Sequence, residues 1–400
     1  MEPPKRLVIL GANLTALAVV RSAARLGIEP YVVDIAHGPA FESRLARKLI
    51  RLHEERSMLI PSIAVLGKST ENSWLVSTAD AWTIELVSHR RVLDANFRRV
   101  LHPQNDALSI CLSKERFAQW CVTNCVPAPR QYAVDPSTYH LEEVAFPAMV
   151  RPALTRHGDK ATGVPKAREV NSQEELNLCF ELFRAAKLTP LVTESLLGRN
   201  LTQISVGVAI DRGNVMSLSA RKLRPNPEAC RVGTLVETID DPASEKLALD
   251  TLRKLQYEGI AEVEILKDLQ TGSMYVIEIN ARPWLQFALG RASKRDFLEF
   301  IVAGGCVDAP TIPTSRRWLD FPGDAWTCFN GTDGMVRFGK LSIAEYVTSL
   351  IQTDVYARWS ANDPWPFVRG GLSIICSSFW SIARALRHRV RSWLDAGALR

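Results

Sequence analysis

Acidic and amide side chains recur at two-residue spacing in two short segments of this 400-residue chain. Glu262 and Glu264 belong to the first segment, and Glu278 and Asn280 belong to the second. Alternate side chains of an extended strand point to the same face, so each pair is expected to share one face of its strand. If the strands form a hairpin that turns near Thr271, Glu264 lies opposite Glu278 and Glu262 lies opposite Asn280.

This arrangement predicts a bound cation. Like charges directly opposite one another weaken a sheet, so three carboxylates gathered on one face need compensation. Carboxylate and amide oxygens suit Mg²⁺ or Mn²⁺ better than zinc, which favours nitrogen and sulfur ligands. A solvated polar face on an edge hairpin is the alternative interpretation. The apolar residues that alternate with the polar ones are expected on the opposite, buried face. These residues are Ala261, Val263, Ile265, Tyr275, Ile277 and Ile279.

Glu264, together with the run Glu278-Ile-Asn280-Ala-Arg282-Pro, resembles the metal-binding end of the ATP-grasp superfamily, particularly its carboxylate–amine ligase-like branch. The resemblance implies that Glu264, Glu278 and Asn280 hold the magnesium ions that bridge the phosphates of ATP. It implies a two-step reaction in which a carboxylate attacks the γ-phosphate and an amine then displaces phosphate from the acylphosphate. Arg282 is expected to be one of the cations that stabilise the transferred group.

The same resemblance extends to a nucleotide-binding lid. The segment from Ser113 to Val134 is similar to the family's entry into this domain, and its first nucleotide-contacting lysine falls on Lys114. Where the family carries a lysine that meets the α-phosphate, this chain has Arg151. Arginine keeps the positive charge but is bulkier and favours bidentate contacts.

The adenine-contacting hinge of the family falls after the next predicted strand. Asn200 is the nearest candidate for a contact with ribose. The hinge itself corresponds to Glu194, Ser195, Leu196 and Leu197. A loop that contains Gly158 and Gly163 is expected to bring backbone N–H groups to the phosphates, supplemented by Arg156 and Lys160. His157 lies in this loop and is the one histidine worth testing.

A basic cluster formed by Arg221, Lys222 and Arg224 ends another predicted strand. The ligase-like branch has a similar Arg-Lys pair at this point. The resemblance implies that Arg221 and Lys222 meet the γ-phosphate or the carboxylate substrate. A solvated loop without a partner is the alternative.

These residues need a scaffold, and the first 34 residues indicate its class. Residues 6–34 read as strand, glycine turn, helix and strand, which predicts a doubly wound α/β domain. Gly11 and Asp34 stand at roughly the dinucleotide spacing, but Asn13 and Ala16 replace the second and third glycines of that fingerprint. Because Gly11 and Asp34 still fit the pattern, an NAD(P)-dependent oxidoreductase is kept as an alternative function.

Composition limits the cellular setting. The hydrophobic content of 46% allows a large core, and no apolar run is long enough to span a membrane. The chain has eight cysteines, and their spacing is not that of metal ligands. Because no export signal is recognised, we expect reduced thiols in a cytoplasmic protein. Of the net charge of +6, five units lie between Arg369 and Arg400, so the remaining chain lacks the basic footprint of a nucleic-acid-binding protein.

We therefore predict an α/β protein with an α+β lid: a Rossmann-like N-terminal domain, a two-part ATP-grasp domain and a mostly helical C-terminal extension. The expected boundaries are 1–110, 111–195 for the lid, 196–305 for the metal and phosphate subdomain, and 306–400. Residues 372–394 read as a basic amphipathic helix, which either packs on the protein or makes peripheral contact with a membrane.

The predicted function is an ATP-dependent ligase that uses ATP with Mg²⁺ or Mn²⁺ and joins a small-molecule carboxylate to an amine. A catalytically silent ATP-binding or membrane-docked interaction protein is the second alternative, based on Arg151 and the basic C-terminus.

Overall fold

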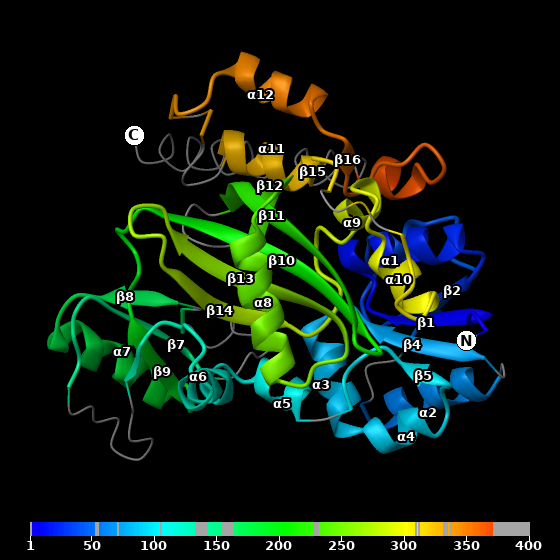
Figure 1. The fold of residues 1–400 in the computed structure, drawn as a ribbon, viewed down its shortest axis with the longest axis horizontal. Coiled ribbons are helices and arrows are strands. Elements are labelled where there is room, and N and C mark those ends of the chain that lie inside the picture. Colours follow the sequence, from blue (N-terminus) through cyan, green and yellow to red (C-terminus); the bar gives the residue numbers. More distant parts are fainter. Residues whose placement is uncertain are drawn as a thin grey trace, which may run out of the picture.

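The computed structural model describes residues 2–52, 56–69, 72–104, 106–132, 143–153, 164–165, 167–226, 232–308, 310, 313–330, 335–336 and 338–370. The predicted phosphate loop at 154–163, with Arg156, His157 and Lys160, lies outside these residues, as does the predicted helix at 372–394. Figure 1 shows the N-terminal domain, the lid and the C-terminal elements arranged around a large central sheet.

The N-terminal domain is a five-stranded parallel sheet in the order β3-β2-β1-β4-β5. Its first strand is covered on both faces: Val8 and Leu10 pack with the helices α2 and α3, whereas Leu7 and Ile9 pack with α1. This is the doubly wound arrangement predicted from residues 6–34. The strands are β1 (Arg6–Leu10), β2 (Glu29–Asp34), β3 (Lys48–Arg51), β4 (Ser73–Ser77) and β5 (Arg99–Val100). The helices are α1 (Leu14–Arg25), the 3-10 helix η1 (Pro39–Glu42), α2 (Arg56–Lys68), α3 (Asp80–Ser88) and α4 (Arg90–Asp94).

The lid is a four-stranded antiparallel sheet in the order β6-β9-β7-β8, with one long helix. It has a hydrophobic core of its own, in which Phe180 and Phe183 of the helix pack against Val150 and Val192 of the sheet. Its elements are β6 (Gln131–Tyr132), β7 (Ala148–Pro152), β8 (Arg168–Val170), α7 (Gln173–Ala185) and β9 (Pro190–Glu194).

The central sheet has the order β14-β13-β10-β11-β12-β15-β16. Helix α8 (Pro242–Lys254) covers one face, where its residues Ala248 and Leu252 share a core with Val206 and Val263. The opposite face carries the predicted metal ligands. The strands are β10 (Leu201–Asp211), β11 (Asn214–Asn226), β12 (Val232–Ile239), β13 (Gly259–Asp268), β14 (Met274–Asn280), β15 (Arg317–Leu319) and β16 (Val355–Tyr356).

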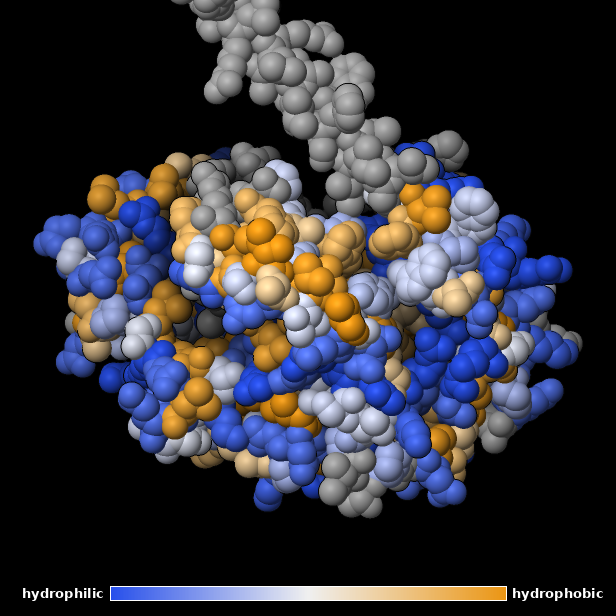
Figure 2. Space-filling view, turned by 90° about the horizontal axis from the view of Figure 1, so that it is seen from above, coloured by the Kyte–Doolittle hydropathy of each residue, from blue (hydrophilic) through white to orange (hydrophobic). Residues whose placement is uncertain are grey.

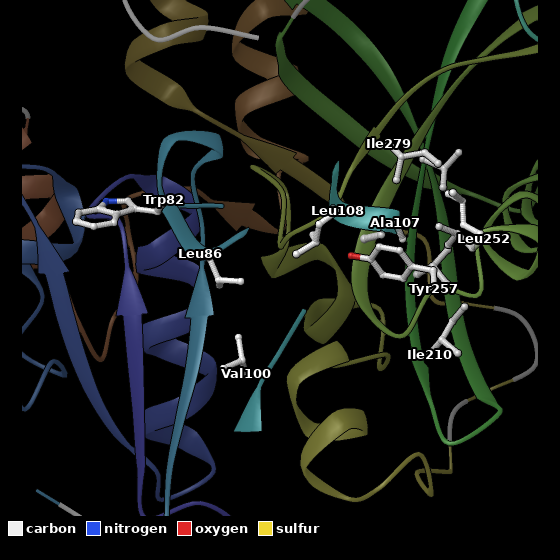
Figure 3. Close-up of a cluster of buried hydrophobic side chains, with 14 of the residues drawn as sticks. Trp82, Leu86, Val100, Ala107, Leu108, Ile210, Leu252, Tyr257 and Ile279 are labelled. Atoms are coloured by element: carbon white, nitrogen blue, oxygen red, sulfur yellow. The ribbon is translucent and has the colours of Figure 1, made fainter. Parts of the chain in front are cut away.

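One continuous core joins the N-terminal domain to the central sheet. Figure 3 shows this cluster, with Trp82 and Val100 on the side of the N-terminal domain and Tyr257 and Ile279 on the side of the central sheet. Leu108 of α5 (Ala107–Leu112) belongs to the same cluster, as do buried residues of α6 (Lys114–Thr123). The shared core fixes the position of the N-terminal domain relative to the metal-ligand face.

The C-terminal part supplies both helices and strands. Helices α9 (Ala288–Ala292) and α10 (Phe297–Val302) lie against α1, and α11 (Phe321–Asn330) lies against β11 and β12. Helix α12 (Ile343–Ile351) contacts β11, because Arg224 donates to Ser349 Oγ at 2.9 Å. Buried ion pairs attach this part to the body, because Arg21 contacts Asp363 at 3.1 Å and Arg224 contacts Asp324 at 2.8 Å. Among the described residues, no helix is both long and apolar enough to cross a membrane.

Candidate nucleotide and metal site

The hairpin of β13 and β14 has the register predicted from the sequence. Glu264 lies opposite Glu278, and Glu262 lies opposite Asn280. Ala261, Val263 and Ile265 face the core beneath α8, as expected from their alternation with the glutamates. The two strands therefore gather their polar residues on the opposite face of the central sheet.

A β-bulge in β14 corrects one part of the sequence prediction. Ile265 pairs with Val276, so Ile277 is an extra residue in the strand. Val276 and Ile279 are buried in the core, whereas Ile277 lines the same cavity as Glu278. The prediction that Tyr275, Ile277 and Ile279 share the buried face is therefore wrong for Tyr275 and Ile277. The inserted residue reverses the alternation on one side of the bulge.

Neighbouring side chains already hold two of the three carboxylates. Lys222 Nζ lies 3.2 Å from Glu264 Oε1, and Gln203 Nε2 donates to Glu264 Oε2 at 2.6 Å. The buried Glu262 accepts from Ser205 Oγ and, at 2.9 Å, from Asn280 Nδ2. The carboxylate of Glu278 has no hydrogen bond or ion pair to any described residue. Glu278 is thus the carboxylate most available to a ligand.

Burial and repulsion raise the pKa values of two of these acids, Glu262 and Glu278. Burial, followed by repulsion from Glu264, raises the pKa of Glu262 to about 7. Burial raises the pKa of Glu278, and Glu264 and Asp80 add to the shift while Lys114 opposes it. A cation bound between the two strands would relieve this unfavourable charge.

The free face of the hairpin forms the floor of a cavity of about 450 Å³ that lies between the central sheet and the lid. Apolar walls come from both sheets, with Met149 from β7 and Leu266 and Ile277 from the hairpin. The predicted site residues that line the cavity are Lys114, Arg151, Glu194, Leu196, Leu197, Lys222, Glu264 and Glu278. Residues more than 160 positions apart in the sequence thus meet in one cavity.

Arg151 is poised for a ligand. Its Nε is buried and has no hydrogen-bond partner among the described residues. Burial lowers the pKa of Arg151, and the negative charge of Glu278 opposes this effect. An unsatisfied buried guanidinium group is costly unless an anion completes its hydrogen bonds. The cavity therefore fits a phosphate group at this position.

The predicted hinge residues differ in their access to the cavity. Leu196 and Leu197 line the cavity beside Glu194, whose carboxylate accepts from the backbone N–H of Arg130 at 2.8 Å. Ser195 is buried and donates to Glu169, and it is not a lining residue. Asn200 is exposed immediately before β10 and also lies outside the lining.

The predicted catalytic cations occupy different places. Lys222 lies inside the cavity, whereas Arg221, its neighbour in β11, points to the other face and pairs with Glu237 at 2.5 Å. Arg282 follows the hairpin, donates to Asp80 Oδ1 at 2.6 Å and lies 3.3 Å from Asn280 Oδ1. Burial lowers the pKa of Arg282, but Asp80 and the glutamates outweigh it and raise the pKa overall.

Two supporting residues were missed in the sequence. Gln203 and Ser205 of β10 bind the carboxylates of Glu264 and Glu262. Their two-residue spacing on either side of Ile204 was the available signal, since it marks a polar row on one face. Asp80 gave no comparable signal, because only the fold brings it to Arg282.

The donor set fits a magnesium–nucleotide complex better than a metal held by protein alone. Among the described residues, no group of three or more His, Cys, Asp or Glu side chains could hold a metal ion. Glu262 is turned toward Ser205 and Asn280, which leaves Glu264 and Glu278 facing the cavity. Mg²⁺ commonly binds through one or two carboxylates and completes its shell with substrate phosphates and water.

The residues that suggested dinucleotide binding make contacts within the N-terminal domain. Gly11 has φ +115°, and a side chain there would lie 2.4 Å from Thr78 Oγ1. Asn13 caps α1 by accepting from the backbone N–H of Ala16 at 2.8 Å. Asp34 accepts from the backbone N–H of Ala12 at 2.7 Å. These contacts close the turn without a ligand.

No family model matches the sequence. Solved structures do match the fold. A biotin carboxylase complex with β,γ-ATP from Campylobacter jejuni has a TM-score of 0.63 at 17% identity, covering 78% of this chain and 75% of that one. A second match is the biotin carboxylase domain of 2-oxoglutarate carboxylase from Hydrogenobacter thermophilus, in complex with MgADP, ADP and bicarbonate. It has a TM-score of 0.61 at 13% identity, covering 78% of this chain and 72% of that one.

An L-amino acid ligase from Bacillus licheniformis gives a TM-score of 0.58 at 13% identity, covering 79% of this chain and 80% of that one. Identities this low establish a shared fold and leave the substrates undetermined. These fold matches agree with the carboxylate hairpin and the separate lid that the sequence resemblance predicts. The cavity described above lies between the two. The chain therefore has the fold of the ATP-grasp superfamily.

Proposed function

We propose that this protein is an ATP-dependent ligase that joins a carboxylate to an amine through an acylphosphate and releases ADP and phosphate. One observation carries the proposal. The facing pair Glu264 and Glu278 lines a cavity that also contains Lys114, Arg151 and Lys222. A facing pair of carboxylates, with three cations in the same cavity, suits a magnesium-bound polyphosphate.

In this proposal the purine lies in the apolar part of the cavity, against Leu196, Leu197 and Met149. Arg151 and Lys114 meet the phosphates, and the unsatisfied Nε of Arg151 supports this assignment. Glu194 lies at the hinge end, whereas the positions of Ser195 and Asn200 favour support of the hinge over direct contact.

Glu264, Glu278 and Asn280 would hold Mg²⁺ (or Mn²⁺), which neutralises phosphate charge when bound. For Asn280 this role requires its amide oxygen to leave Arg282, 3.3 Å away. For Glu264 it requires competition with Lys222, which would then be released toward the γ-phosphate. The MgADP in the H. thermophilus structure supports a magnesium–nucleotide complex in this fold.

In the first step, a carboxylate oxygen of the substrate bonds to the γ-phosphorus, and the bond to the bridging oxygen breaks to release ADP. In the second step, the amine nitrogen bonds to the acyl carbon, phosphate leaves with the bonding electrons, and the amine loses a proton. Lys222 and Arg282 stabilise the charge that develops. Arg221 lies on the other face of the sheet, so the proposed catalytic set contains Lys222 and Arg282 only.

We infer that the substrates are a small carboxylate and a small amine, and that the reaction takes place in the cytoplasm. The test is an ADP-release assay in which the full chain receives MgATP and pooled amino acids, followed by mass spectrometry of the products. ADP release that depends on a carboxylate–amine pair, with a condensed product lighter by one water than its parts, is expected. ATP binding without ADP release from any pool would instead select the catalytically silent alternative.

A further inference from the structure

A further cavity, of about 260 Å³, lies between the N-terminal domain and the C-terminal part of the chain. Helices α1 and α9, strand β16 and the residues after it form its walls, and the small side chains of Ala18 and Ala288 leave room inside. Among the described residues, it shares no lining residue with the nucleotide cavity that contains Glu278. Cavities for drug-sized ligands have roughly 300–1,000 Å³. A ligand of this cavity, which we call the β16 cavity, is therefore a small molecule.

One wall of the β16 cavity is an exposed aromatic ring. Trp359 lines the cavity and is 45% exposed. Phe367 packs against this ring in a T-shaped contact, with the centroids 5.6 Å apart, and so holds it in place. Strand β16 lies on the side of the molecule that Figure 2 views from above, where apolar patches are set among hydrophilic residues. An exposed indole ring held in this way can stack with a planar ring of a ligand.

The acids that line the β16 cavity are already neutralised. Asp296 pairs with Arg25 at 3.0 Å and caps the start of α10. Asp354 pairs with Arg316 at 3.0 Å and accepts from the backbone N–H of Arg317 at 2.8 Å. These partners satisfy both carboxylates, so neither acid requires a bound cation.

Arg291 is a lining cation without such a partner. It is exposed, and its guanidinium group makes no hydrogen bond or ion pair with any described residue. The other lining arginine, Arg21, is buried and donates to Asp363 and to the carbonyls of Ala357 and Arg358. Burial lowers the pKa of Arg21, Asp363 opposes this effect, and the positive charge of Arg291 adds to it. The two guanidinium groups therefore repel each other, and an anion bound to Arg291 would relieve the repulsion.

These features define the chemistry of a ligand. Arginine pairs with a carboxylate through two parallel N–H donors. The hydroxyl of Ser360 also lines the cavity, makes no hydrogen bond to a described residue and can donate to the same carboxylate. A cationic ligand would be repelled by the unpaired charge of Arg291, and a neutral ring would leave that charge without a partner.

We propose that the β16 cavity binds a small aromatic carboxylate, with its ring against Trp359 and its carboxylate on Arg291. Ser360 supplies a further hydrogen-bond donor. The proposal is independent of the ligase proposal, because it uses none of the residues assigned to ATP or metal.

The test measures the affinity of the full chain for cinnamate by calorimetry. Cinnamamide keeps the planar ring of this probe but has no charge, and cyclohexanecarboxylate keeps the charge but is not aromatic. Cinnamate should bind at least about tenfold more tightly than cinnamamide, because a hydrogen bond to a charged group is the stronger one. It should bind at least about threefold more tightly than cyclohexanecarboxylate, because only a planar ring can stack on Trp359.

Arg291→Gln should weaken cinnamate binding about tenfold and remove the preference for cinnamate over cinnamamide. Trp359→Leu should weaken cinnamate binding about threefold and leave the affinity for cyclohexanecarboxylate unchanged. Lys294→Gln is the matched control, since Lys294 is an exposed cation three residues after Arg291 that does not line the cavity. It should bind cinnamate as the wild type does. The melting temperature of Arg291→Gln should hardly change, because the replaced side chain is exposed.

The proposal is overturned if the wild type binds cinnamate no better than cinnamamide, or if Arg291→Gln keeps the wild-type affinity. Arg151→Ala tests the nucleotide cavity, which contains another cation with an unsatisfied donor. This variant should bind cinnamate normally. Loss of binding in Arg151→Ala, together with normal binding in Arg291→Gln, would place the ligand in the nucleotide cavity and overturn the proposal as well.

Discussion

The guanidinium Nε of Arg282 lies 2.6 Å from Asp80 Oδ1, and this contact joins the end of the metal hairpin to the first turn of α3. The two residues are 202 positions apart in the sequence. Arg282 also lies 3.3 Å from Asn280 Oδ1, so one side chain connects the N-terminal domain to a proposed metal ligand. Asp80 thus positions Arg282 without lining the cavity.

We expect Asp80→Asn to lower ADP release about tenfold at saturating MgATP, or ~1.4 kcal/mol of barrier. The asparagine keeps the shape but no longer holds the guanidinium by charge. ATP affinity measured by calorimetry should stay the same. Asp94→Asn is the control, because it removes a surface ion pair with Arg90 in the same domain. Equal turnover in Asp80→Asn and wild type would show that Asp80 has no positioning role.

Glu278→Gln should separate stability from activity. Loss of a metal-ligand oxygen is expected to reduce turnover by about 10²-fold or more. The pKa of Glu278 is raised in the folded protein, mainly by burial, so ionisation of this group costs folding stability as the pH rises. The ligand-free variant should therefore melt at a higher temperature than the wild type near neutral pH.

Glu237→Gln is the matched control for Glu278, since Glu237 lies on the same sheet but pairs with Arg221 and Arg317. It should leave turnover unchanged. Wild-type turnover in Glu278→Gln would refute the metal assignment.

Arg151 should determine ATP affinity. We expect Arg151→Ala to weaken ATP binding at least about tenfold, because a buried charge-assisted hydrogen bond is worth about 1.5–3 kcal/mol. Arg151→Lys should keep or improve the affinity, since lysine retains the charge with less bulk. Arg221→Ala is the control for a cation on the opposite face and should bind ATP normally. Equal affinities in all four proteins, measured by calorimetry, would place Arg151 outside the site.

His102 should make the protein sensitive to acid. Burial lowers the pKa of His102 to about 3, and the ring bridges the Ser77 backbone N–H and the Ala281 carbonyl. Because the unfolded chain takes up this proton at about pH 6.5, stability is lost as the pH falls below that value, by up to about 1.4 kcal/mol per unit.

Denaturant unfolding near pH 7 and near pH 5 measures this effect. His102→Gln should reduce the difference between the two pH values, whereas the exposed His89→Gln should keep it. The same pH dependence in His102→Gln and wild type would contradict the assignment.

The sequence was most informative where chemistry and local geometry coincide. The pairing of Glu264 with Glu278 could be predicted because a short turn at Gly272 fixes the register of two adjacent strands. The bulge at Ile277 could not be predicted, because polar and apolar residues alternate through this segment without interruption. The pairing with β13 determines where the extra residue lies. Arg221 and Lys222 illustrate a related limit: consecutive strand residues face opposite ways, so only one of them could reach the cavity.

Contacts between distant segments were out of reach. The bond of Lys222 to Glu264 spans 42 positions, and that of Asp80 to Arg282 spans 202. A single sequence contains no record of such neighbours. The fold supplies them by placing the ends of the N-terminal strands beside the hairpin.

The separate hydrophobic core of the lid gives it a thermodynamic identity of its own. In the described chain, its buried residues belong to a different cluster from those joining the N-terminal domain and the central sheet. Cooperative unfolding units follow such clusters. Amide hydrogens of β7 and β9 should therefore exchange through an opening that leaves β1 and β10 protected. A nucleotide bridging Arg151 and Glu278 would couple the two units and slow that exchange.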